Sequence, residues 1–434
     1  MNVTLLQVTL TTLSPVSVTT PEIHDFRTVT GVGGVAQDSV DMPLRRDASG
    51  APTIPATTVA GSIRAHLPDA LREPLMGRAG DDPTPSPLYV LAVAVTPPKQ
   101  GEGTEVRRRT AIDRHRAAPA ARKLFDIEAL AAGTTLTVSM ELHGPPSMRD
   151  ELLAALASWH PRVGRGVSTG AGRTELQSLT YATVDLVDDD ALLAYLNGVG
   201  PDFITQTLAR AGQPATIEPR ASTLEFNVDL RIMDALHVGS GDARGNLLLM
   251  LRDTQGSPVV PGSSLKGVLR SRCEHILRSI GVAACLDAAC GTCPTCDLFG
   301  FTLATPDEDG RTGQRGLVAF RDAPVTQATE AQRPHVAIDR VSGGARDSAL
   351  YAVECVDGGV VTIKIEKLAP LPPWAEGLIG AALLDIADGY VGVGGATTRG
   401  YGTLARRQGD VFDRATATAA LQQVRRDYGL EVDA

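Results

Sequence analysis

The sequence predicts an α+β protein that contains two tandem copies of one domain, each with a long β-hairpin. Residues 110–128 (TAIDRHRAAPAARKLFDIE) align with 336–354 (VAIDRVSGGARDSALYAVE) without a gap. Two further pairs of segments match, and all three matches occur in the same order in both halves. Chance seldom produces such an order, so the chain is interpreted as an internal repeat.

The two further pairs flank the hairpins. Residues 47–55 (DASGAPTIP) correspond to 253–261 (DTQGSPVVP), and the glycine-rich 163–176 (VGRGVSTGAGRTEL) resembles 393–404 (VGGATTRGYGTL). The predicted organisation is a first domain at 1–185, a linker at 186–220, a second domain at 221–408 and a C-terminal helical tail at 409–434.

Each copy has the same order of elements. Alternating apolar residues predict a first strand at 3–13 and at 224–232. A short helix follows, which in the second copy keeps helical spacing from Leu265 to Ile280 and can end at Gly281. The remaining elements are the hairpin, a strand (134–142; 359–366), a helix (150–159; 375–387), the glycine-rich turn and a last strand. This order is that of a ferredoxin-like fold, which RNA-recognition motifs share.

Composition narrows the class of protein. A chain of 434 residues with 43% apolar and 21% charged residues predicts an ordinary globular protein of two or three domains. The net charge of −9 argues against a general polycation but permits a local basic groove. The longest apolar run, 88–95, is too short to cross a bilayer, and the N-terminus lacks the basic start of a secretory signal. We therefore expect a cytoplasmic protein with reduced thiols and no membrane partner.

Four motifs of the second copy stand out: the helix start at 260–271 (VPGSSLKGVLRS), the segment 293–300 (CPTCDLFG), the hairpin 336–351 (VAIDRVSGGARDSALY) and the glycine-rich loop near the C-terminus. Together they resemble the RAMP family, the repeat-associated proteins of CRISPR effector complexes. The resemblance is nearest to the backbone subunits of type III complexes. It is stronger in the second copy, because the first lacks the LFG sequence, the cysteines and the two hairpin glycines.

The resemblance implies a tandem fusion of two backbone subunits. Each would bind guide RNA (crRNA) and push its hairpin, the thumb, through the guide–target duplex. The implied partners are complementary target RNA and other effector subunits: a large signalling or nuclease subunit, small subunits and other RAMP proteins.

The resemblance also implies where target RNA is cut. The family's cleaving aspartate lies six residues before the Lys/Arg-Asp pair, where this chain has Asp41 in the first copy and Leu247 in the second. Mg²⁺ or a similar divalent ion would assist cleavage. Asp38 is a rival in the first loop, and Asp242 could substitute in the second.

The first hairpin is strongly basic. Between Arg107 and Lys123 seven basic residues stand against one acid, a pattern suited to phosphate contacts or, alternatively, to a solvated face. Phe125 and Tyr351 occupy one slot of the repeat and could stack on a base or fill a small core. The predicted RNA-binding residues are Arg46, Arg64, Arg107, Arg108, Arg109, Arg114, Arg116, Phe125, Arg165, Lys266, Arg270, Arg340, Tyr351 and Arg399.

Four of the six cysteines lie within twelve residues: Cys285, Cys290, Cys293 and Cys296. Thiolates at C-x2-C spacing favour tetrahedral zinc, so we expect a structural Zn²⁺ site in an insertion of the second domain. Free thiols or a redox pair are the alternatives, and Cys273 or His275 could replace Cys285 as a ligand. A closed four-ligand site leaves no position for catalysis.

Three functional hypotheses follow. The first is a guide-RNA-binding backbone subunit that also cleaves complementary RNA as an endoribonuclease, through Asp41. The second is a non-catalytic scaffold of the same complex. The third is a guide-processing ribonuclease, which is disfavoured because no histidine occupies equivalent slots in the two copies.

Overall fold

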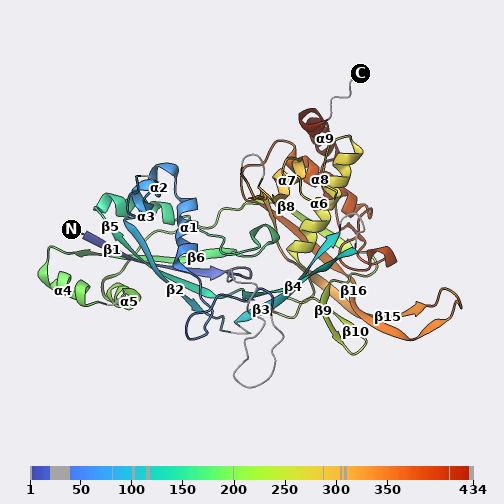
Figure 1. Cartoon of the computed structure of the whole chain (residues 1–434), viewed down its shortest axis with the longest axis horizontal. Coiled ribbons are helices and arrows are strands. Elements are labelled where there is room, and N and C mark those ends of the chain that lie inside the picture. Colours follow the sequence, from blue (N-terminus) through green and yellow to red (C-terminus); the bar gives the residue numbers. More distant parts are fainter. Residues whose placement is uncertain are drawn as a thin grey trace. The chain divides into compact units, whose positions relative to one another are not determined.

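The structure is a computed structural model of the chain (Figure 1). It describes residues 2–19, 40–80, 82–99, 103–113, 118–198, 200–286, 288–303, 305–306, 310–409 and 411–429, with 111–113 and 118–124 described in their backbone alone. The chain forms two compact units. Unit 1 comprises Met1–Arg107, Phe125–Val167 and Ala171–Ser222, and unit 2 comprises Arg108–Leu124, Ser168–Gly170 and Thr223–Ala434. The outer part of the first hairpin, Arg108–Leu124, and Ser168–Gly170 of the first glycine-rich loop thus belong to the unit built mainly by the second copy.

Unit 1 is a sheet with helices on both faces. Its elements are β1 (Asn2–Thr12), α1 (Ala56–His66), α2 (Asp69–Met76), β2 (Leu88–Thr96), β5 (Thr135–His143), α3 (Pro146–Leu156), β6 (Thr174–Asp185), α4 (Asp189–Asn197), α5 (Gly200–Ala211) and β7 (Gln213–Pro214). The strand order is β2-β5-β1-β6-β7, and each neighbouring pair is antiparallel. In the centre of the sheet, Val8 pairs with Val138 on one side and Leu179 on the other.

Strand β1 contributes to two apolar clusters of unit 1. Leu6, Val8 and Leu10 are buried in the main core together with residues of α1, α2 and α3. Val3 and Leu5 belong to a second cluster with residues of α5. The segment 186–220 is therefore an integral part of unit 1, and its prediction as a linker was wrong. The reason is that α5 buries an apolar face that covers the sheet.

Unit 2 contains a larger mixed sheet. Its elements are β8 (Leu224–Ile232), β9 (Gly239–Arg244), β10 (Leu247–Met250), β11 (Val259–Val260), α6 (Gly262–Ser279), α7 (Pro294–Phe299), β12 (Gly300–Thr302), β13 (Gly313–Arg315), β14 (Val318–Phe320), β15 (Ala323–Ile338), β16 (Ala345–Lys367), α8 (Ala375–Ala387), β17 (Leu404–Arg406) and α9 (Arg414–Tyr428). Strands β14, β16, β8 and β17 pair antiparallel in that order. This order matches β2, β5, β1 and β6 of unit 1: in both units the first strand lies between the third and the last, and the second strand lies beyond the third.

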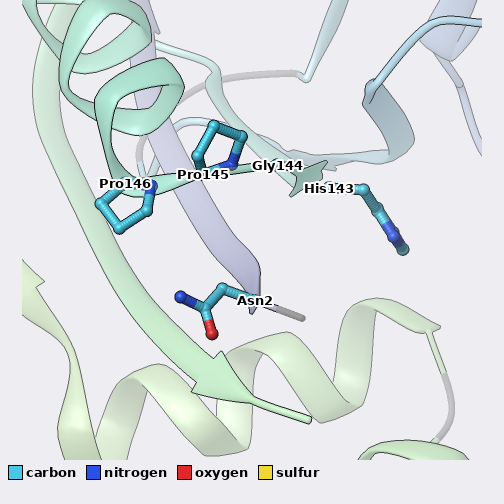
Figure 2. Close-up of a pocket in the computed structure, with 5 residues that line it drawn as sticks. All are labelled: Asn2, His143, Gly144, Pro145 and Pro146. Carbon is cyan, nitrogen blue, oxygen red and sulfur yellow. The ribbon is translucent and has the colours of Figure 1, made fainter. Parts of the chain in front are cut away.

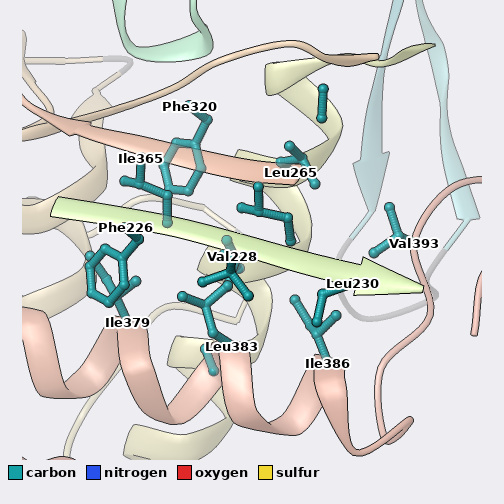
Figure 3. Close-up of a cluster of buried hydrophobic side chains, with 14 of the residues drawn as sticks. Phe226, Val228, Leu230, Leu265, Phe320, Ile365, Ile379, Leu383, Ile386 and Val393 are labelled. Carbon is teal, nitrogen blue, oxygen red and sulfur yellow. The ribbon is translucent and has the colours of Figure 1, made fainter. Parts of the chain in front are cut away.

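The core of unit 2 lies between this sheet and two helices. Figure 3 shows Phe226, Val228 and Leu230 of β8 pointing toward α8, whose Leu383 lies among them. Leu265 of α6 is in the same cluster. The predicted helices at 265–280 and 375–387 match α6 and α8, and α9 forms the helical tail, which packs on α8.

Two long hairpins leave the units. The first is β3 (Thr104–Asp113) with β4 (Ala118–Leu130), and the second is β15 with β16. The second hairpin keeps its pairing from Val325–Val361 to Ile338–Ala345. Among the described residues, no helix is long and apolar enough to cross a membrane.

Candidate RNA-binding surface and metal centre

Each hairpin carries a glutamate that accepts a backbone N–H bond and has an arginine nearby. Glu128 accepts a hydrogen bond of 2.9 Å from the backbone N–H of Leu44 and pairs with Arg46 at 2.5 Å. In the second copy, Glu354 accepts from Met250 N–H at 3.0 Å. Arg252 lies 3.8 Å from Glu354 but pairs more closely with Glu330, at 2.8 Å. The predicted RNA contact of Arg46 is thus in competition with a carboxylate that is 10% exposed. The match of both partners across the repeat was a sequence signal for this pairing.

Asp41 lies beside the base of the first hairpin. Its carboxylate accepts a hydrogen bond of 2.9 Å from the backbone N–H of Asp126, the residue after Phe125. The Asp41 side chain is exposed and Phe125 is half-buried. Met42 forms a parallel bridge with Ile127, which fixes this stretch of loop against β4.

Strand β10 repeats this arrangement in the second copy. It runs parallel to β16, with Leu247 opposite Ala352 and Leu248 opposite Val353. Ala352 follows Tyr351 as Asp126 follows Phe125. Leu247 is therefore the structural equivalent of Asp41, as the sequence spacing predicts.

The alternative acids differ in their surroundings. Asp38 lies outside the described residues. Asp242 lies in β9, where Arg108 donates to its carboxylate at 3.3 Å and to the Gly241 carbonyl at 3.0 Å. Asp242 thus faces a cation of the first hairpin, whereas Asp41 accepts from a backbone amide.

The arginines of the first hairpin whose side chains the structure describes have intramolecular partners. Arg107 pairs with Glu105, and Arg109 donates to the Thr169 hydroxyl at 3.3 Å. The predicted residues Arg114 and Arg116 lie outside the described residues. Pairing lowers the number of phosphates that this run can neutralise.

Two further predicted arginines also contact the protein. Arg64 donates to the carbonyls of Met76 and Gly77 at 3.1 and 3.0 Å, and so closes the end of α2. Arg165 is exposed in the glycine-rich loop and donates to the Thr19 hydroxyl at 3.2 Å. Both arginines are exposed, so these contacts leave their side chains accessible.

Lys266 and Arg270, one turn apart on α6, differ in their environment. Lys266 donates to the Ser168 hydroxyl at 2.9 Å, and burial and the neighbouring Arg270 lower its pKa to about 8. Arg270 points into unit 2 and donates to Glu274 at 3.0 Å and to the Gly300 carbonyl at 2.6 Å.

Tyr351 belongs to an aromatic cluster at the base of the second hairpin. His335 stacks on Tyr351 with ring centroids 5.3 Å apart and lies 2.8 Å from the Tyr401 hydroxyl. Arg399 donates to the Tyr351 hydroxyl at 2.6 Å. The predicted residues Tyr351 and Arg399 therefore lie together, joined by His335 and Tyr401. The sequence did not single out His335, because its slot in the first copy holds Arg109.

Arg340 lies at the exposed turn of the second hairpin. The neighbouring Asp339 accepts backbone N–H bonds from Val341 and Ser342 at 2.9 and 2.8 Å. These bonds hold the pKa of Asp339 below its usual range and shape the turn. Arg340 is thus displayed on an ordered turn.

The glycine-rich loops fold alike in both copies. Gly172 and Gly402 have φ of 77° and 78°, and a Cβ on either would lie within 2.3 and 2.0 Å of the carbonyl oxygens of Val163 and Val393. No residue with a side chain fits these positions without moving the backbone. The glycines are required for the turn itself, whether or not a phosphate binds there.

The four predicted ligands of the metal site lie together. The Sγ atom of Cys285 is 3.4 Å from that of Cys290 and 3.5 Å from those of Cys293 and Cys296. All four sulfur atoms lie within 4.8 Å of one another. Zn–S bonds of about 2.3 Å in a tetrahedron place sulfur atoms about 3.8 Å apart, so the cluster fits a metal such as zinc. Cys273 is instead buried in the core, where its thiol lies 3.8 Å from the Leu378 carbonyl.

Two pockets have little relation to the hairpins. One of 510 Å³ is lined by Asn2, His143, Gly144, Pro145 and Pro146, and Figure 2 shows the His143 ring pointing away from the prolines. The other, of 350 Å³, opens beside the cysteine cluster and is bordered by Tyr428. Neither contains a residue predicted to bind RNA.

Comparison with known proteins agrees with the repeat. No curated protein matches the chain. The model of the RAMP superfamily matches residues 9–175 and 229–405, which covers one region in each half. Proteins of this superfamily are generally CRISPR-associated RNA-binding subunits that bind crRNA within multi-subunit complexes. The chain belongs to the RAMP superfamily and carries two RAMP regions in tandem.

Proposed function

We propose that the chain is a fused pair of type III backbone subunits, which binds guide RNA and cleaves complementary target RNA once, through Asp41. The observation that carries this proposal is the position of Asp41. Its exposed carboxylate is fixed by Asp126 N–H at 2.9 Å, beside the half-buried Phe125 at the base of the hairpin. Its equivalent in the second copy is Leu247, which has no acid–base chemistry.

The cleavage step follows from the chemistry of RNA. The thumb displaces one nucleotide, and the 2′-oxygen attacks the adjacent phosphorus in line with the 5′-oxygen. Asp41 orients the 2′-hydroxyl and takes its proton, the P–O5′ bond breaks, and the 5′-oxygen takes a proton from water. The products are a 2′,3′-cyclic phosphate and a 5′-hydroxyl end.

A divalent ion has no preassembled site at Asp41. Among the described residues, the cysteine cluster is the only group of three or more metal-ligating side chains. A Mg²⁺ ion near Asp41 would need water and RNA phosphates as its remaining ligands. An ion bound there would stabilise charge on the phosphate, and magnesium dependence of the cut is a prediction of this proposal.

The shared strand order supports a ferredoxin-like fold for each copy. The aromatic cluster of His335, Tyr351 and Tyr401, with Arg399, offers ring faces and a cation for bases and phosphates of the guide. The proposed partners are guide RNA, complementary RNA and the other subunits of the effector complex. The proposed metal is a structural Zn²⁺ on the four cysteines.

The test is guided cleavage. The effector complex that contains the chain and a guide RNA is mixed with end-labelled complementary RNA. Asp41→Asn should slow one cut by about 10²- to 10⁴-fold while guide and target affinities stay the same. Asp242→Asn is the matched control and should leave that cut intact. A target with 2′-deoxyribose at the cut position should not be cleaved.

The outcomes separate the hypotheses. Unchanged cleavage by Asp41→Asn would refute the nuclease assignment, and absence of any guided cut in the wild type would favour the non-catalytic scaffold. Failure of the chain to bind guide RNA at all would refute the backbone role.

A further inference from the structure

Two arginines of helix α6 reach the loop that holds the four cysteines. Arg270 donates through Nη2 to the Sγ atom of Cys296 at 3.5 Å and through Nη1 to the Gly300 carbonyl at 2.6 Å. Arg278, two turns later, donates to the Cys285 carbonyl at 2.6 Å. The helix thus contacts both the first and the last ligand of the cluster.

Each of the three guanidinium nitrogens of Arg270 donates a hydrogen bond to an atom of the protein. Its third nitrogen, Nε, donates to Glu274 at 3.0 Å, and the side chain is 15% exposed. Glu274 is itself buried, with 1% exposure, so this carboxylate holds the guanidinium in one orientation. All three nitrogens of Arg270 therefore face the protein, which is not the arrangement of a side chain that awaits an RNA phosphate.

We propose that Arg270 is a positioning residue of the metal centre, which donates an N–H···S hydrogen bond to the Cys296 thiolate, and that it is not an RNA ligand. This inference rests on the proposed metal centre. Four thiolates with one divalent ion carry a net charge of −2, which an adjacent guanidinium offsets. Hydrogen bonds to ligand atoms orient the ligands and raise metal affinity.

The two basic residues of α6 then have separate roles. Lys266, which is predicted to bind RNA, contacts Ser168 of the first glycine-rich loop. Arg270 contacts Cys296 and Gly300, one turn farther along. The helix connects the metal loop to the proposed RNA surface.

The test compares Arg270→Gln with Arg272→Gln. Arg272 is a matched control on the same helix, because its side chain is 22% exposed and donates to Asp385 at 2.6 Å. Zinc affinity, measured by competition with a chelator, should fall about 10- to 100-fold in Arg270→Gln and stay unchanged in Arg272→Gln. In the cobalt-substituted protein, Arg270→Gln should move the thiolate-to-metal charge-transfer band to longer wavelength, because a sulfur without its hydrogen bond gives up electrons more readily.

Arg270→Lys keeps the positive charge but loses the planar set of N–H donors of the guanidinium. Its zinc affinity should therefore lie between those of the wild type and Arg270→Gln. It also serves as the reference if Arg270→Gln does not fold. With zinc at saturation, Arg270→Gln should bind guide RNA as the wild type does.

Equal zinc affinity and an unmoved cobalt band in Arg270→Gln would overturn the role of Arg270 alone. Loss of RNA affinity with intact metal binding would make Arg270 an RNA ligand after all. A wild-type protein that binds no metal would overturn the metal centre itself.

Discussion

Leu247 lies at the backbone position in the second copy that Asp41 holds in the first. Leu247 pairs with Ala352 in the parallel β10–β16 ladder, and Asp41 accepts the N–H of Asp126 at the corresponding place. The aromatic residues Tyr351 and Phe125 immediately precede these partners. Leu247 lies in a strand and Asp41 in a bend, and the position in the first copy carries the carboxylate.

This relationship predicts that a second cut can be introduced. Leu247→Asp should add a new guided cut at the register of the second hairpin, since the carboxylate would enter the place that Asp41 has in the first. The measurement is the pattern of end-labelled products from complementary RNA. Leu248→Asp is the control, because its side chain pairs one residue later and faces the other side of the strand. The idea under test is that a carboxylate at this position determines whether RNA is cut. A new cut with Leu248→Asp, or no new cut with Leu247→Asp, would contradict it.

Lys266 predicts a pH dependence of RNA binding. Burial and Arg270 lower its pKa to about 8, so the free protein loses this proton as the pH rises through 8. RNA phosphates favour the protonated form. RNA affinity should therefore fall above about pH 8, by up to about tenfold per pH unit if one proton is taken up on binding.

The control for this prediction is Lys266→Arg, which stays charged and should give a flat profile between pH 7 and pH 9. In the absence of RNA, the lowered pKa has the opposite effect on folding. The unfolded chain binds more protons between about pH 8 and the ordinary value of 10.5, so this group makes the free energy of unfolding rise across that range. The same slope of RNA affinity in wild type and Lys266→Arg would show that Lys266 does not contact RNA.

The exposed arginines at the turn of the second hairpin are expected to make a salt-dependent contribution to RNA affinity. Arg340 and Arg346 are both exposed there. Replacing both by Ala should reduce the slope of log affinity against log salt by roughly 1.5 to 2 units, if each arginine contacts one phosphate. Arg425 and Arg426 on α9 are the matched control pair, and their replacement should leave the slope unchanged. An unchanged slope for the hairpin pair would mean that these arginines are only solvated.

The cysteine cluster predicts one tightly bound metal ion. The purified protein should contain about one zinc per chain, and Cys293→Ser with Cys296→Ser should abolish it. Thermal unfolding should then show a weakened unit 2 and an unchanged unit 1, because the cluster lies in unit 2 alone. Cys355→Ser is the control, since its thiol lies outside the cluster, and should keep the metal. Well-folded protein without metal would contradict the prediction.

Much of the framework was predictable from the sequence. The strand Leu224–Ile232 was predicted from its alternating apolar residues, and every second residue from Phe226 to Ile232 is buried in the structure. The predicted helix Ala375–Ala387 is also present, and most of its residues are buried. The cysteines were also predictable, since the four ligands come from one short loop and need no long-range information.

The partners of charged residues were less predictable. Arg64, predicted to bind RNA, donates to the carbonyl of Met76 at the end of α2, and Arg46 pairs with Glu128, 82 residues away. A basic residue can satisfy its charge with RNA, with a carboxylate or with a carbonyl. The local sequence does not distinguish these outcomes, because the partner is brought in by folding.

The repeat, the order of elements in each copy, the loop with four cysteines and the difference between Asp41 and Leu247 can all be read from residue type and spacing along the chain. Three features could be seen in the folded chain alone: α5 covers the sheet of unit 1, Arg108–Leu124 belong to unit 2, and Arg270 faces Cys296 instead of solvent. These features depend on contacts between residues far apart in sequence, and such contacts form only when apolar faces are buried and polar groups must find partners.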